Sequence, residues 1–150
     1  MKTTCPDLDW SKSFMYSIHR TYFLIEKRLE HKLHESKGIS FSQFLILLAL
    51  HCNERTSQSA IADFLHITEA TVSRHIAQLE KAKYLTHKED PINRRKHILT
   101  MTALGTRAFT NAHTIIEREL KDVFEVIPVA DRSLITKAFD GVIAKLHDRS

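Results

Sequence analysis

Glycine, proline and cysteine are all scarce in this sequence. Three glycines and three prolines in 150 residues are too few for the many turns of a β-sandwich or β-barrel, which argues against those folds. Two cysteines form no disulfide framework, and no CxxC or Cys/His spacing typical of zinc is present. No apolar run approaches the roughly 18 residues of a membrane span, and the N-terminus lacks the apolar core of a signal peptide. We therefore expect a cytoplasmic protein with no cofactor, no metal and no membrane partner.

Catalytic fingerprints are also missing. The sequence contains no GxSxG elbow, HExxH helix, P-loop or dinucleotide-binding glycine motif. Lysine and arginine number 22 against 18 acidic residues, a formal net charge of +4. A modest positive charge permits a nucleic-acid partner but does not by itself indicate one. We therefore interpret the chain as a binding protein and not as an enzyme.

Helical periodicity marks both ends of the chain. Apolar residues recur at spacings of three and four over about residues 10–33, the pattern of one long helix. Further helices are predicted over about residues 103–126 and 131–147, and Pro128 ends the first of these two. Their apolar faces are too extensive for one small lobe to bury. This excess predicts a homodimer in which a second subunit covers them.

The middle of the chain begins with a capping-box pattern. Ser40 is followed three residues later by Gln43, which predicts the start of a helix over about residues 41–51. This helix is apolar on most sides, so we expect it to be the central buried helix.

Two shorter helices follow. Ser57 can cap a helix over about residues 58–65, and Thr68 can cap a second over about residues 69–82. The second is amphipathic, and its apolar face carries Val72, Ile76 and Leu79 at spacings of four and three. A tight turn joins the two, which is the pattern of a helix-turn-helix.

The periodicity then changes to that of strands. Strand-like runs over residues 84–88 and 96–100 flank a turn that contains Pro91 and Asn93. The densest basic run of the chain, residues 94–96, falls at this turn. A helix-turn-helix followed by a β-hairpin is a winged helix, so the predicted fold is mainly α with a small β-hairpin wing.

Several of these segments, in order and at the right separations, resemble the MarR family of bacterial transcriptional regulators. The matching segments are Ile39–Phe44, Ser57–Ala62, Thr68–Ile76 and Asp90–Arg95. The resemblance implies one MarR-type domain over residues 1–150. Residues 10–36 and 103–147 would form a helical dimerisation lobe, and residues 38–101 a winged helix-turn-helix DNA-binding lobe.

The sequence departs from the family pattern at two positions. Lys83 stands where the family commonly has glycine after the recognition helix, so we expect the left-handed cap residue to be missing. Asn93 stands where the family usually has an aspartate that holds the wing arginine in place. The wing arginine is therefore less firmly anchored here, unless Asp90 substitutes.

The resemblance and the chemistry of the side chains together suggest a DNA-binding surface. The candidates are Ser57, Gln58, Thr68, Glu69, Thr71, Ser73, Arg74, His75, Gln78, Arg94, Arg95 and Lys96. In the major groove, arginine can pair with guanine, glutamine with adenine, and a threonine methyl with thymine. The helix N-terminus at Ser57 suits a phosphate, and the resemblance implies that Arg95 enters the minor groove or contacts phosphate. The alternatives are a solvated helix face, simple capping and a solubilising turn.

Two further clusters have both a functional and a structural interpretation. The first cluster consists of the aromatic side chains of His19, Tyr22, Phe23, Phe41 and Phe44. These side chains can line a pocket for a small aromatic effector, as in relatives that bind aromatic acids, or they can be ordinary core. His31 and His34 can supply half a metal site, but no third ligand is near in sequence, so we favour a solvated helix end.

The sequence thus predicts a homodimeric regulator that binds a pseudo-palindromic site in double-stranded DNA. A small ligand would shift the population toward a dimer whose two recognition helices no longer fit both half-sites. The alternative is a winged-helix protein-interaction module that does not bind DNA.

Overall fold

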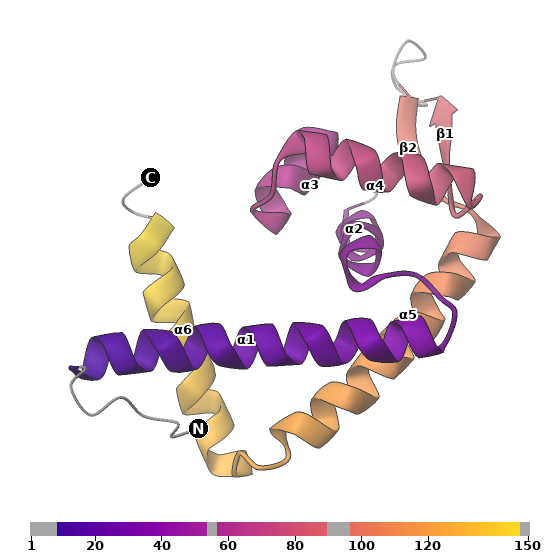
Figure 1. The fold of residues 1–150 in the computed structure, drawn as a ribbon. Helices are drawn as coiled ribbons and strands as arrows, with labels where there is room; N and C mark the ends of the chain where they lie inside the picture. Colours follow the sequence, from indigo (N-terminus) through magenta and orange to yellow (C-terminus); the bar gives the residue numbers. More distant parts are fainter. Residues whose placement is uncertain (1–8, 54–56, 90–96, 148–150) are drawn as a thin grey trace. The chain divides into compact units, whose positions relative to one another are not determined.

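The computed structural model describes residues 9–53, 57–89 and 97–147, and Figure 1 shows their fold. The elements are α1 (Trp10–Glu35), α2 (Phe41–Cys52), α3 (Gln58–Leu65), α4 (Glu69–Lys81), β1 (Leu85–Glu89), β2 (His97–Met101), α5 (Ala103–Phe124) and α6 (Val129–His147). The mainly helical winged-helix fold predicted from the sequence is confirmed. The chain divides into two compact units, residues 1–116 and 117–150, and α5 runs from the first into the second.

Side-chain caps determine where the three central helices begin. At α2 the Gln43 N–H donates to Ser40 Oγ at 3.2 Å, and the Ser40 N–H donates to Gln43 Oε1 at 3.1 Å. This is the reciprocal capping box predicted from the sequence. Ser57 and Thr68 each accept the N–H of the residue three positions on, at 3.1 and 3.2 Å. The predicted starts of α2, α3 and α4 are therefore confirmed.

The C-terminus of α4 corrects one expectation. We expected no left-handed cap, because lysine replaces the family's glycine, yet Lys83 adopts the left-handed conformation itself, with φ 61°. The Tyr84 N–H donates to the Leu79 carbonyl at 2.8 Å and the Lys83 N–H to the Glu80 carbonyl at 2.8 Å. These two bonds form the Schellman arrangement that normally ends on glycine. The geometry is therefore retained, and the lysine backbone carries its strain.

The core of the first unit forms around α2, which contacts α1, α3, α4 and β2. Val72, Ile76 and Leu79 of α4 are buried, as the sequence predicts. Other buried apolar side chains are Leu29, Leu33, Ile39, Phe44, Ile46, Leu47, Ala49, Leu50, Ile61, Ala62, Leu85, Leu99, Phe109, Ala112 and Ile116. Because one face of α4 is held in this core, its opposite face is fixed toward solvent.

Strands β1 and β2 pair in antiparallel register, with Leu85 opposite Met101, and join the end of α4 to the start of α5. Thr102 Oγ1 accepts the Gly105 N–H at 3.0 Å and so caps α5. The Thr102 N–H donates to the Tyr84 carbonyl at 3.0 Å. A Cβ at Gly105 would lie 2.0 Å from that carbonyl oxygen, so only glycine allows this close approach.

Long apolar surfaces remain uncovered within each unit. In the first unit, α1 exposes Phe14, Met15, Tyr16, Ile18, Tyr22, Phe23 and Leu24. In the second, α6 exposes Leu134, Ile135, Phe139, Val142, Ile143 and Leu146. Among the described residues, no helix is both long enough and apolar enough to cross a bilayer.

Candidate nucleic-acid interface

The solvent face of α4 collects most of the predicted DNA contacts. Thr68, Glu69, Ser73, Arg74 and Gln78 are exposed, whereas Thr71 and His75 are half-buried. Arg74 and Gln78 are four residues apart, so they lie one helical turn from each other on the same face. Figure 1 shows α4 between α3 and the hairpin. The structure therefore presents an amphipathic helix whose polar face is not covered by the described residues of its own unit.

Half-burial restricts what His75 can do. Its Nδ1 is fully buried and has no hydrogen-bond partner among the described residues. Because Nδ1 is enclosed by the protein, Nε2 is the ring nitrogen left for an external contact.

The capping hydroxyls are already engaged. Thr68 Oγ1 lies 2.9 Å from Thr71 Oγ1, in addition to capping α4. Ser57 Oγ lies 3.2 Å from Ser59 Oγ at the start of α3, next to the half-buried Gln58. These residues organise the helix N-termini, whose remaining backbone N–H groups are the donors suited to phosphate.

Two contacts that tie α4 to its neighbours were not predicted from the sequence. Gln43 Nε2 donates to Gln78 Oε1 at 3.3 Å, a hydrogen bond between residues 35 positions apart. His87 Nε2 on β1 lies 2.8 Å from Glu80 Oε1. The capping-box spacing located Gln43, but no local pattern in the sequence could have shown its partner.

The basic tip of the hairpin, Arg94, Arg95 and Lys96, lies outside the described residues, as does Asn93. The structure does describe the two strands that carry it, which are paired up to Glu89 and His97. The predicted contacts of the tip with DNA stay predictions.

His31, near the end of α1, lies in a group of charged side chains. His31 Nε2 lies 3.2 Å from Glu35 Oε1, and Lys32 Nζ lies 2.9 Å from Glu35 Oε2. The hydrogen bond from the Lys32 ammonium, and its charge, lower the pKa of Glu35. His31 thus belongs to an exposed ion-pair cluster, and no group of three or more metal-ligating side chains occurs among the residues described.

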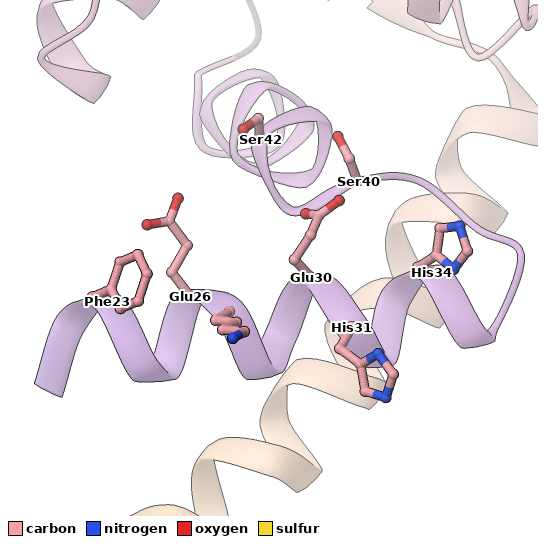
Figure 2. Close-up of a pocket in the computed structure, with 8 residues that line it drawn as sticks. Phe23, Glu26, Glu30, His31, His34, Ser40 and Ser42 are labelled. Atoms are coloured by element: carbon pink, nitrogen blue, oxygen red, sulfur yellow. The ribbon is translucent and has the colours of Figure 1, made fainter. Parts of the chain in front are cut away.

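A cavity of about 720 Å³ lies beside α1 and the start of α2 (Figure 2). Its lining residues are Phe23, Glu26, Lys27, Glu30, His31, His34, Ser40 and Ser42. Figure 2 shows Glu26 and Glu30 on the side of α1 that faces α2, with His31 pointing away. Glu30 Oε2 also accepts the Phe41 N–H at 2.7 Å. Two carboxylates give this cavity an acidic wall that the sequence did not predict.

Of the five predicted effector residues, the structure brings only Phe23 to this cavity. Phe44 is buried and stacks on Phe109 of α5, with ring centroids 5.3 Å apart. The Phe41 ring lies 6.3 Å from that of Phe44. His19 and Tyr22 are exposed on α1. Phe44 is therefore part of the core, which was the structural alternative for this cluster.

A second cavity, of about 600 Å³, lies between the end of α1, Tyr84 and the first half of α5. Its apolar lining includes Leu33, Ile39, Leu104, Ala108 and Ile115. Its polar lining includes Lys37, Arg107 and Asn111, and none of its lining residues is acidic. These two cavities therefore differ in their charged lining, since the first combines Glu26 and Glu30 with Lys27, whereas the charged residues of the second, Lys37 and Arg107, are both cations.

Comparison with known proteins agrees with this architecture. The model of the MarR family matches residues 39–97, which run from the start of α2 to the start of β2. The uncharacterised HTH-type transcriptional regulator YvnA of Bacillus subtilis (strain 168) is 25% identical over 114 residues, 74% of this chain and 73% of that protein. The part of this chain from residue 39 to residue 97 therefore matches the MarR family, and the chain as a whole is similar to HTH-type transcriptional regulators.

Solved structures extend the likeness beyond the winged helix. The MepR–DNA complex of S. aureus has a TM-score of 0.75 at 17% identity, covering 95% of this chain and 99% of that one. BpsR of Bordetella bronchiseptica, whose DNA binding is regulated by 6-hydroxynicotinic acid, has a TM-score of 0.75 at 24% identity, covering 90% and 96% of the two chains. The MarR fold therefore accounts for nearly the whole chain.

Proposed function

We propose that this protein is a MarR-family regulator that binds double-stranded DNA with the solvent face of α4 in the major groove. The observation that carries the proposal is the division of α4: Val72, Ile76 and Leu79 anchor one face in the core, while Arg74 and Gln78 project from the other. A major groove admits one α-helix, and base edges are read by such side chains. The MepR complex, which has the same fold, contains DNA.

Different residues supply different parts of the binding energy. Arg74 is the best candidate for a bidentate contact with guanine, because it is exposed near the middle of α4. Ser57 and Gln58 at the start of α3 suit a phosphate, since a helix N-terminus offers unpaired N–H groups. Residues 94–96 add phosphate or minor-groove contacts, which strengthen binding to any sequence.

The regulator acts in the cytoplasm as a homodimer on a pseudo-palindromic site. Exposed apolar faces on α1 and α6, within residues 10–36 and 103–147, support this part of the proposal, because monomers rarely leave such surfaces uncovered. Residues 38–101 then form one DNA-binding lobe in each subunit. Light scattering at micromolar concentration should report twice the 17.4 kDa chain mass, and a single monomeric species would refute the dimer.

A small effector completes the proposal. The carboxylate of an aromatic acid is repelled by Glu26 and Glu30 in the first cavity and attracted by Lys37 and Arg107 in the second. We therefore place an acidic effector in the second cavity, where apolar walls suit an aromatic ring. Tyr84 lines this cavity and is hydrogen-bonded to the end of α4, so a ligand there can shift the recognition helix.

Calorimetric titration with benzoate tests this placement. Arg107→Gln should weaken benzoate binding, whereas Glu26→Gln, which removes a charge from the first cavity, should not. The reverse result, or binding of benzylamine in place of benzoate, would assign the effector to the cavity that Phe23 lines.

DNA binding is tested by letting the purified protein select duplexes from a random pool. The same experiment identifies the sequence that the protein prefers. Affinity for the selected duplex should fall steeply as salt is raised, because phosphate contacts release counterions. Absence of duplex binding at every salt concentration would favour the alternative, a winged-helix protein-interaction module.

A further inference from the structure

Gln43, at the third position of α2, has both ends of its side-chain amide engaged. Its Oε1 accepts the backbone N–H of Ser40 at 3.1 Å. A backbone N–H can only donate, so the oxygen end of the Gln43 amide must face Ser40. The orientation of this amide is therefore determined by chemistry, although the oxygen and nitrogen ends have nearly the same shape.

The fixed orientation of Gln43 determines that of Gln78 on the recognition helix. With its oxygen on Ser40, Gln43 points Nε2 at Gln78 and donates to Gln78 Oε1 at 3.3 Å. If Gln78 were turned over, two amide nitrogens would face each other with no acceptor between them. Gln78 therefore turns its oxygen toward α2, where one of its two lone pairs accepts from Gln43, and its two Nε2 hydrogens become the groups that face outward.

This arrangement changes what Gln78 can recognise. A bidentate contact with adenine needs an outward-facing oxygen to accept from N6 together with a nitrogen to donate to N7. A side chain that turns its donor toward the groove and its acceptor toward α2 instead matches an acceptor in the groove, such as O6 or N7 of guanine or O4 of thymine. This differs from the expectation, drawn from residue type alone, that glutamine pairs with adenine.

We propose that Gln78 is a specificity residue that presents its donor to the groove and selects an acceptor-bearing base, and that Gln43 is the positioning residue that sets this polarity. The proposal rests on the function proposed above, because it concerns how α4 reads duplex DNA. According to the proposal, Gln43 of α2 helps to determine which DNA sequence is bound, although Gln43 itself needs no contact with DNA.

Gln43→Glu tests the proposal directly. Glutamate at this capping-box position still accepts the Ser40 N–H, so the start of α2 should be retained. It offers no donor, so Gln78 must turn its Nε2 toward the new carboxylate and present Oε1 outward. The variant should therefore prefer a donor-bearing base, the N4 of cytosine or the N6 of adenine, where the wild type prefers an acceptor.

The base pair to be varied is the one at which Gln78→Ala loses the preference of the wild type. The readout is the ratio of the affinities for two duplexes that differ only at this base pair. We expect this ratio to change by about tenfold, the scale of one good base contact. The added negative charge also weakens binding to all duplexes, and for that reason the ratio, not the affinity, is measured. Ser42→Glu places the same charge on the same turn of α2 and should lower affinity without changing the ratio.

The double variant Gln43→Glu/Gln78→Ala provides the internal control, since without Gln78 the change at Gln43 should not affect base preference. If Gln43→Glu does not fold, as judged by circular dichroism, Gln78→Lys gives a second test: a donor-only lysine should keep the wild-type preference. Any one of three results would overturn the proposal. These are an unchanged affinity ratio in Gln43→Glu, retention of all wild-type base preferences in Gln78→Ala, and a reversed base preference in Gln78→Lys. Failure of the wild type to bind any duplex would instead refute the proposed function on which it rests.

Discussion

The left-handed backbone conformation of Lys83 predicts that replacing this residue with glycine stabilises the protein. The φ of 61° at Lys83 places a side chain in a left-handed conformation that costs an L-residue roughly 1–2 kcal/mol. Glycine removes this strain but loses about 0.5–1 kcal/mol through the greater freedom of the unfolded chain. Because both Schellman hydrogen bonds come from backbone N–H groups, Lys83→Gly retains them. The net expectation is a gain of about 0.5–1 kcal/mol.

Thermal unfolding at a fixed protein concentration is the assay, since unfolding of an oligomer depends on concentration. A gain of this size raises Tm by about 1–4 °C in a chain of this length. Ala82→Gly is the matched control: it lies one residue earlier with φ −78°, an ordinary right-handed conformation. That change should lower the free energy of unfolding by roughly 0.5–1 kcal/mol. If both variants were destabilised equally, the strain assigned to Lys83 would be wrong.

Three other substitutions test the fold and the wing. Leu79→Ala should lower the free energy of unfolding by about 2–5 kcal/mol, because Leu79 is fully buried; an unchanged urea midpoint would mean that the faces of α4 are assigned backwards. Gly105→Ala should lower Tm, because its Cβ would lie 2.0 Å from the Tyr84 carbonyl oxygen; wild-type Tm would show that this approach is not tight. Arg95→Ala should weaken binding to all duplexes alike and reduce the slope of affinity against salt by about one unit; loss confined to one preferred duplex would instead make Arg95 a reader of bases.

The helices could be predicted from the sequence because their determinants are local. The capping hydroxyls of Ser40, Ser57 and Thr68 lie within three residues of the N–H groups that they satisfy. The spacing of Val72, Ile76 and Leu79 likewise assigned the buried face of α4 correctly. Patterns of this kind need no knowledge of distant segments.

Features that depend on distant segments could not be predicted. The Gln43–Gln78 hydrogen bond joins two helices, and the His87–Glu80 pair joins a strand to a helix. The sequence also gave no indication of the acidic wall of the first cavity. Lys83 shows a different limit: residue type argued against a left-handed cap, but the surrounding hydrogen bonds determine the backbone conformation there.

Base reading by the solvent face of α4 is the central claim, and Arg74→Ala tests it most directly. Affinities are measured for the selected duplex and for a scrambled duplex of the same length and composition, with Lys121→Ala, an exposed cation on α5, as the charge control. Arg74→Ala should reduce the preference for the selected duplex by roughly 1–3 kcal/mol, the value of a bidentate guanine contact. Lys121→Ala should leave that preference unchanged. Equal losses on both duplexes in Arg74→Ala would show that Arg74 contacts only the backbone and would contradict the claim.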